Sequence, residues 1–396
     1  MNLLLLIVSS LNILLHTAST LPTEQVSIFP DRDVLDISTK PIAYSGNNNL
    51  SVIEIDHLLY GHRDVSYFLT RDSIAIIDGD IIFGTEGELL AHQANQSAHD
   101  DIRGLAFSAP APWPEATITW KFDSTTTEAN LGAEVGVAIA RWEVSAPFLN
   151  FRQIPNSPTS QSGVVTIRAV ACDGCHADIG YANAPRTMNL QQGCIGNPGT
   201  CGPDQATHEF GHILGLRHEH QRPDRERYVH YSCQDLNPSC INGATMPPGS
   251  TCCSPVANCC GFASNFEIIT DPFSDSSGIY DANSIMHYIE NAFAIPGTET
   301  LISVNTAIVV PKNPPTNPSA VDFNRICKLY ANWCPKAQEC RSLGCPTFCS
   351  IRPPCHSPRC AGDPKFAPSC CDNGGDNADC RQQKRLCISN GCDFLR

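Results

Sequence analysis

The sequence predicts an α+β fold for the central part of the chain. Three observations indicate this class: an alternating strand pattern at 116–122, an amphipathic helical pattern at 128–144, and a further strand and long helix after them. The order strand, helix, strand, helix is typical of a mixed sheet with helices packed against it.

The first strand, "ATITWKF", alternates apolar side chains with the polar Thr117, Thr119 and Lys121, which predicts one buried face and one open face. The helix at 128–144 carries an apolar stripe, which consists of Leu131, Val135, Ala138, Ile139 and Trp142. Residues 164–170, "VVTIRAV", predict the second strand.

A second helix is predicted to begin near Gln205, with Asp204 as its N-cap. At about 100° per residue, His208 and His212 share one face of this helix. Apolar side chains gather on the opposite face: Ala206, Phe210, Ile213 and Leu214. Two neutral imidazoles one turn apart can chelate one zinc ion. Glu209 lies beside the pair and can reach a metal-bound water without binding the metal.

Gly215 explains how a third ligand reaches the same ion. Glycine accepts left-handed dihedral angles and ends helices, so the chain can turn and return His218 to the metal. Three neutral imidazoles leave the ion its full charge, which lowers the pKa of a bound water toward about 7. The sequence therefore predicts one Zn²⁺ per chain.

Cysteine usage and charge restrict the compartment and the partners. The chain has 22 cysteines, none of them before Cys172, a density typical of secreted, disulfide-bonded proteins. The formal net charge of -14, without a Lys/Arg run, argues against nucleic acid as a partner.

The chain divides into regions of different composition. Residues 1–20 are apolar and read as a secretory signal peptide, not a membrane anchor, which predicts an extracellular protein. Residues 21–103, acidic and free of cysteine, read as a pro-segment. The zinc domain spans 104–334 and includes a Cys-rich insertion at about 232–261. Residues 335–396 form a separate Cys-rich tail of unknown role, which is a candidate binding region for an unknown partner.

The stretch from His208 to Arg225, "HEFGHILGLRHEHQRPDR", resembles the zinc signature of the astacin family of metzincin endopeptidases, and the similarity extends over about 104–334. The resemblance implies a metzincin-like catalytic domain, in which a mixed twisted sheet and two long helices flank a zinc cleft. It assigns the zinc ligands to His208, His212 and His218, and the general base to Glu209.

The segment "YDANSIMHY" resembles the part of the family that contains the Met-turn. The resemblance implies that Met286 forms an apolar floor under the imidazoles. It also implies that Tyr288 is a further zinc ligand in the resting enzyme and stabilises the oxyanion during catalysis. Three other histidines do not fall at ligand positions and are interpreted as structural or surface residues: His220, His230 and His287.

The pro-segment stretch "AIIDGDIIFGTEGELL" resembles the family motif in which an aspartate after a glycine binds the metal. Gly79 would allow close backbone approach, and Asp80 would be a zinc ligand in the pro-form. We call Asp80 in this role the latch. We expect it to leave the metal after cleavage near Arg103, the only basic residue between Arg71 and Lys121.

The resemblance also bears on the disulfides. It implies a Cys175–Cys194 bridge, which leaves Cys172 and Cys201 for a second one. The cysteine that the family usually has after its first long helix is absent, so Cys327 and Cys334 pair with each other or with the insertion.

The sequence-based hypothesis is a secreted zinc-dependent endopeptidase, made as a zymogen, that cleaves proteins or peptides bound along an edge strand near "ADIGY", residues 177–181. Two alternatives belong to other classes. "CDGCH", residues 172–176, formally matches a c-type haem attachment site. The chain could also be a secreted binding protein or adhesin that acts through its Cys-rich tail, with the zinc domain as a scaffold.

Overall fold

The computed structural model describes these residues: 51–57, 61–93, 111–193, 200–237, 252–253, 262–269, 278–304, 306 and 308–335. The expected signal peptide, most of the 232–261 insertion, and the 335–396 tail except Pro335 lie outside the described residues. Within the described ranges, no helix has both the length and the apolar character needed to cross a membrane.

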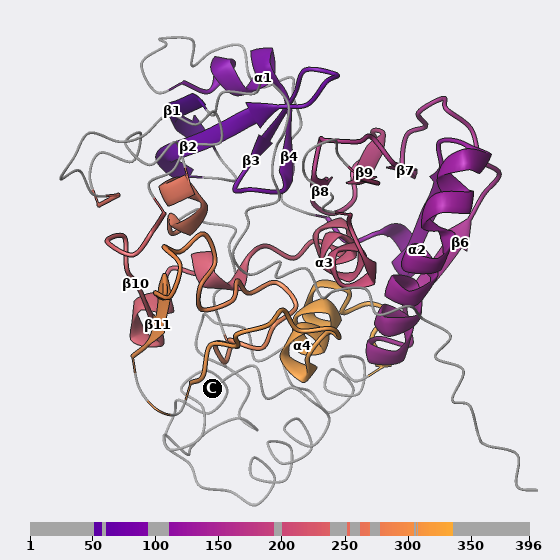
Figure 1. Ribbon diagram of the computed structural model, residues 1–396. Helices are drawn as coiled ribbons and strands as arrows, with labels where there is room; N and C mark the ends of the chain where they lie inside the picture. The colour runs from indigo at the N-terminus through magenta and orange to yellow at the C-terminus, as the bar shows by residue number, and fades with distance from the viewer. Residues whose placement is uncertain are drawn as a thin grey trace, which may run out of the picture. The chain divides into compact units, whose positions relative to one another are not determined.

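A nine-stranded mixed sheet runs in the order β1-β2-β3-β4-β8-β9-β7-β5-β6 (Figure 1). Its second half contains β5 (Thr117–Phe122), β6 (Asn150–Gln153), β7 (Val165–Arg168), β8 (Cys175–Ala177) and β9 (Arg186–Leu190). Strand β5 pairs in parallel with β6 and β7, and β7 pairs in parallel with β9, whereas β8 is antiparallel to β9. The expected α+β class with a mixed sheet is confirmed.

The first half of the sheet comes from the segment interpreted as a pro-segment, where no strands were predicted. It contains β1 (Ser51–His57), β2 (Gly61–Leu69), β3 (Ile74–Ile77), β4 (Ile81–Thr85) and the short helix α1 (Glu86–Ala91). These strands form an antiparallel meander. The meander has a buried core of its own, made by Ile55, Val65, Tyr67, Ala75, Ile77, Ile81, Phe83 and Leu89.

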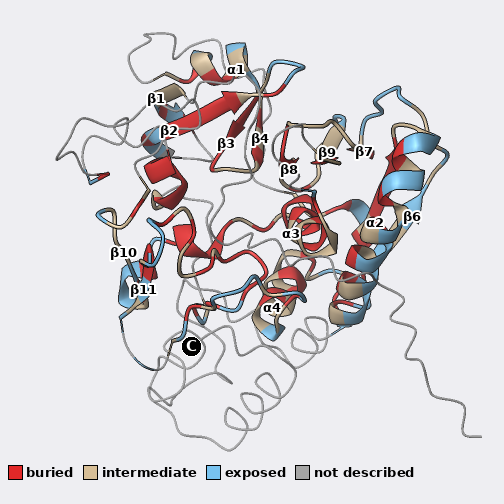
Figure 2. Ribbon diagram, in the orientation of Figure 1, coloured by how far each residue is buried: buried red, intermediate tan, exposed pale blue. Residues whose placement is uncertain are grey.

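Two long helices, α2 (Thr125–Ser145) and α3 (Pro203–Leu214), pack against the central sheet. The short η2 (Pro114–Ala116) leads into β5, and α4 (Ala320–Leu329) follows the second core in the sequence. The predicted stripe of α2 faces the core, with Ile139 only partly buried, and the outer side of the helix is exposed (Figure 2). Helix α2 begins three residues before the predicted start, because the Ser124 hydroxyl accepts a hydrogen bond from the amide of Thr127.

The part of the chain after α3 has less regular structure and a second apolar core. It contains η3 (Glu219–Gln221), η4 (Arg225–Arg227), β10 (Val229–Tyr231), η6 (Phe262–Phe266) and β11 (Leu301–Ser303). Strands β10 and β11 form a separate two-stranded sheet. The second core includes Val229, Phe262, Phe266, Tyr280, Ile289 and Leu301.

The prediction of one open face on β5 is wrong. Thr119 and Lys121 are buried, and Lys121 has no exposed surface. The strand lies between β6 and β7, and the loop after β6 covers its polar side, where the ammonium group of Lys121 donates to the carbonyl of Thr159 at 2.5 Å. Alternation alone could not predict this, because a later loop supplies the cover.

The disulfides correct one expectation and decide another. Cys175 pairs with Cys201, so the implied Cys175–Cys194 and Cys172–Cys201 bridges are wrong. Cys327 pairs with Cys334, one of the two alternatives. A disulfide bond between Cys233 and Cys253 lies within the insertion. Cys172 is also disulfide-bonded, so neither thiol of "CDGCH" is free to bind haem, and the haem alternative is excluded.

Two buried histidines of the meander make its stability depend on pH. The rings of His57 and His92 lie 4.3 Å apart. Burial, then His92 and Arg217, lower the pKa of His57 from 6.5 to about 3. Burial also lowers the pKa of His92, which Asp56 partly opposes.

Between pH 6.5 and about 3, the unfolded chain therefore binds a proton at position 57 that the folded chain does not. Stability should fall as pH falls through this window, by up to about 1.4 kcal/mol per pH unit for one such histidine. We expect His57→Phe to flatten this slope in denaturant unfolding measured across pH. His62→Gln, at an exposed position of the same meander, should leave it unchanged. Equal slopes for the parent and His57→Phe would contradict this account.

Candidate metal centre

Helix α3 presents two histidines toward the interior of the site. It begins at Pro203 with Gly202 as the N-cap, so the predicted Asp204 cap is wrong by two residues. Proline at the first helical position needs no hydrogen-bond partner for its nitrogen, and Asp204 instead pairs with Arg141 at 2.7 Å. The predicted apolar back is fully buried: Ala206, Phe210, Ile213 and Leu214. Gly215 ends the helix with a φ of 108°, as predicted.

Side chains from three other elements hold α3 by its backbone carbonyls. The indole of Trp113 donates to Ile213 at 2.7 Å, and the hydroxyl of Tyr330 donates to Leu214 at 3.1 Å. The indole of Trp142 donates to Thr207 at 2.9 Å. The last carbonyls of a helix have no partner within it, so the bonds to Ile213 and Leu214 satisfy two of them, and all three bonds fix the helix position.

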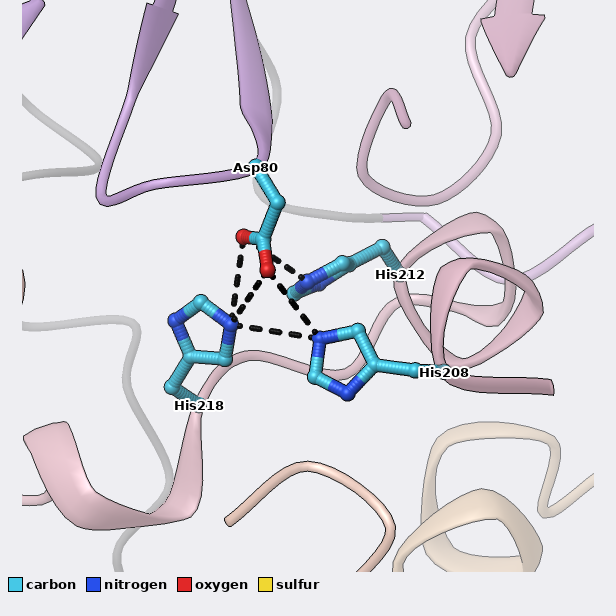
Figure 3. Close-up of side chains that lie close together, drawn as sticks. All are labelled: Asp80, His208, His212 and His218. Atoms are coloured by element: carbon cyan, nitrogen blue, oxygen red, sulfur yellow. Dashed lines mark hydrogen bonds and ion pairs between the residues drawn. The ribbon is translucent and has the colours of Figure 1, made fainter. Parts of the chain in front are cut away.

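Four side chains meet beside α3: Asp80, His208, His212 and His218 (Figure 3). The carboxylate of Asp80 lies 3.3 Å from the Nε2 atom of His208, 3.4 Å from that of His212 and 3.2 Å from that of His218. The Nε2 atoms of His208 and His218 are 3.3 Å apart. The structure therefore brings together the three predicted zinc ligands and the predicted pro-segment aspartate.

The other ring nitrogen of each histidine determines the tautomer. The Nδ1 atom of His208 contacts the Ile285 carbonyl at 2.7 Å, and that of His212 contacts the Leu216 carbonyl at 2.9 Å. The Nδ1 atom of His218 contacts the side-chain oxygen of Gln221 at 3.1 Å. Since these oxygens only accept, each Nδ1 carries the proton. All three Nε2 lone pairs then point at the centre.

This donor set fits zinc. Ligands about 2.0–2.1 Å from a tetrahedral ion lie about 3.3–3.4 Å from one another, close to the separations found here. Within the described part of the chain, Asp80 Oδ1 and His212 Nε2 are buried without a hydrogen-bond partner. Lone pairs that face each other at this distance repel unless a cation lies between them. The centre is a zinc site formed by three histidines, and the Asp80 carboxylate lies beside them as a fourth donor.

Glu209 lies on α3 beside the ligands and is 2% exposed. Burial and the charge of Asp80 raise its pKa well above the usual value. One of its carboxylate oxygens, Oε2, has no hydrogen-bond partner in the described ranges.

Met286 packs against α3 at Gly211, and its role as an apolar floor under the imidazoles stays a prediction. It has no exposed surface, and a Cβ atom at position 211 would overlap its sulfur. Gly211 is thus required where the turn that bears Met286 approaches α3, between the two histidines of the helix. The amide of Glu219, next to His218, donates to the Met286 carbonyl at 3.0 Å and joins the third ligand to the same turn.

Tyr288 stacks on a buried histidine. Its ring lies 4.0 Å from that of His220 at 23°, and its hydroxyl donates to the carbonyl of Asp78 at 3.3 Å. Asp80 joins the three histidines in the metal cluster, and Tyr288 as a further zinc ligand stays a prediction. His220 and His287 are buried, and burial lowers the pKa of His287 to about 4. Both are structural residues, whereas His230 is exposed.

Two residues that support the site were not identified from the sequence. Gln221 orients His218 through its side chain. Arg325 of α4 binds the buried carboxylate of Glu219, with both contacts at 2.5 Å. Gln221 lies three residues after a ligand, a spacing that could have indicated a contact. Arg325 lies more than a hundred residues from Glu219, and no local pattern joins them.

The backbone around Asp80 approaches the site closely. Gly79 has a φ of 95°, and a Cβ atom there would lie 2.8 Å from the Tyr288 hydroxyl and 3.1 Å from the side-chain amide of Asn265. The predicted need for glycine before Asp80 agrees with these contacts. Asp78 is buried and pairs with Arg63 at 2.5 Å, which fixes the turn from inside the meander.

Comparisons with known proteins find similarity to zinc peptidases over part of the chain. Residues 108–245 match the family model described as Astacin, a family of peptidases. The chain is 28% identical to the zinc metalloproteinase nas-5 of Caenorhabditis elegans over 184 residues, which cover 45% of this chain and 43% of that protein. It is 27% identical to nas-34 of the same organism over 271 residues, which cover 68% of this chain and 37% of that protein.

The chain thus spans less than half the length of these two relatives. Among solved structures, it is similar to High choriolytic enzyme 1, a hatching enzyme zinc-protease from Oryzias latipes, at 20% identity. That match covers 56% of this chain and 94% of the other, with a TM-score of 0.40, which supports no inference about activity.

Proposed function

Residues 108–245 belong to the astacin family of peptidases, and on this premise we propose that the protein is a secreted zinc-dependent endopeptidase made as a zymogen. The observation that carries the proposal is the convergence of three imidazole Nε2 atoms beside Glu209, a buried carboxylate that is not among the four clustered donors. The substrates are proteins or peptides, and the secreted location follows from the cysteine content and from the leader at 1–20.

A zinc ion held by His208, His212 and His218 would supply Lewis acidity, polarising the scissile carbonyl and lowering the pKa of bound water. Glu209 takes the proton from the attacking water and delivers it to the leaving amine. In the present state the Tyr288 hydroxyl donates a hydrogen bond to the Asp78 carbonyl of the pro-segment. After the pro-segment has left, the same hydroxyl donates a hydrogen bond to the oxyanion.

The substrate binds as an added strand along β8, within or next to "ADIGY". This edge already accepts a strand, because β4 pairs with β8 at Ile81 and Ala177, and the amide of Ala177 donates to the Asp80 carbonyl at 3.0 Å. An extended peptide would use the same backbone groups once β4 has gone.

Glu209→Gln should retain zinc, because Glu209 is not among the clustered donors. Peptide hydrolysis by the activated enzyme should fall by about 10²–10⁴-fold, since the group that moves the proton is lost. Metal analysis together with turnover of a fluorogenic peptide measures both effects. Glu143→Gln, at an exposed position on α2, is the matched control. Activity within about tenfold of the parent would show that Glu209 is not the base.

Tyr288→Phe should lower kcat by about 10²-fold and change KM little, because the hydroxyl acts on the transition state. The ring and its stacking on His220 remain, so folding should be unaffected. Tyr231→Phe removes a buried hydroxyl elsewhere in the second core and is the control. A raised KM with unchanged kcat would refute the oxyanion role.

Asp80→Ala should give partial activity in the uncleaved protein, because the carboxylate no longer fills the fourth position of the metal, whereas β4 still covers β8. The parent pro-form should be inactive in the same peptide assay. Asp64→Ala, at an exposed position on β2, should also stay inactive. A folded, zinc-loaded Asp80→Ala pro-form without any activity would exclude Asp80 as the latch.

A further inference from the structure

Cleavage before the zinc domain does not by itself explain how the latch leaves, because 51–93 is a folded unit and not an extended peptide. Strands β1 and β2 pair over all seven residues of β1. The Thr85 hydroxyl and the Glu88 carboxylate form a capping box at the start of α1. The fully buried residues of its core all belong to its own sequence.

The end of the unit is tied back to its beginning. The amide of Asp56 donates to the carbonyl of His92 at 2.9 Å, and Gln93 forms a bridge with Ile55. A cut between 94 and 110 falls outside these bonds. Cleavage near Arg103 would therefore leave the meander closed, so it would not unravel from its new end.

The unit also contacts the zinc domain on both sides of Asp80. On the sheet side, β4 adds to β8, and Asp72 pairs with Arg168 at 2.6 Å. On the other side, the amide of Ser66 donates to the Ser264 hydroxyl of η6 at 2.9 Å. The two serine hydroxyls are hydrogen-bonded as well.

We propose that residues 51–93, once cut from the zinc domain, remain bound to it as a separate inhibitory chain. The proposal rests on the proposed function and concerns how that same site is controlled. A preorganised ligand loses little conformational freedom on binding, so the contacts that hold the unit in the intact chain still hold it after the cut. Activation then requires two events, cleavage of the chain and displacement of the unit from β8, η6 and the metal centre.

The test uses the full chain with the recognition sequence of a specific protease inserted between Ala98 and His99. After cutting at neutral pH, the two pieces should co-elute in native size-exclusion chromatography. Turnover of a fluorogenic peptide should stay at least about tenfold below that of the enzyme freed from the fragment. Separate elution with immediate activity would overturn the proposal and leave the peptidase assignment intact. Co-elution with full activity would also overturn it.

Variants in the unit give a second measure without altering the zinc domain. Ser66→Arg places a bulky cation against Ser264, on the face of β2 that points away from the core residues Val65 and Tyr67. Asp72→Lys, at an exposed position, reverses the charge opposite Arg168. After the cut, either variant should release the fragment and raise turnover.

Glu54→Lys is the matched control, because this exposed acid pairs with His62 of the same unit, and the variant fragment should stay bound and inhibitory. If all three variants behave alike after the cut, the assigned interface is wrong. If the fragment is released and the zinc-loaded domain is still inactive, the peptidase function fails instead.

Discussion

The structure depends on one electrostatic constraint, which is that three imidazole lone pairs point at a common centre. The Nε2 atoms of His208 and His218 lie 3.3 Å apart, and the Nδ1 atom of each ring donates a hydrogen bond to an oxygen. Such a set is repulsive unless a cation fills it, so the free energy of metal binding and the folding of this region are coupled. The carbonyls of Ile285 and Leu216 and the side chain of Gln221 fix the imidazoles in the orientation that the metal needs.

The surrounding fold can be understood as support for this centre. Helix α3 supplies two ligands, and its carbonyls are held by Trp113, Trp142 and Tyr330. Helix α4 supports the turn that carries Met286, because Asp322 accepts hydrogen bonds from the Ser284 hydroxyl at 2.5 Å and from the Ile285 amide at 2.9 Å. Segments far apart in the sequence thus fix one small volume, and the position of each ligand depends on several elements at once.

How much of this could be predicted from the sequence depends on the range of the interactions. The ligands, the apolar back of α3 and the helix end at Gly215 follow from local spacing, and the structure agrees with them. The prediction of an open face on β5 was wrong because a later loop covers Lys121. The Cys175–Cys201 bridge could not be derived, since spacing does not give connectivity. The strands of 51–85 escaped prediction because buried polar residues such as Arg63 interrupt the apolar pattern, and Asp78 neutralises that charge inside the fold.

Strand β8 links control and catalysis in this account. It is the edge at which the central sheet would end, and an uncovered edge presents backbone groups that accept another strand. In the present state β4 covers it, and the same turn delivers Asp80 to the metal and the Asp78 carbonyl to the Tyr288 hydroxyl. One displacement of the meander would therefore expose the edge strand, the open metal position and the tyrosine together. Since these groups are blocked by a single folded unit, full activity requires displacement of that unit, and the strength of the whole interface decides when the site opens.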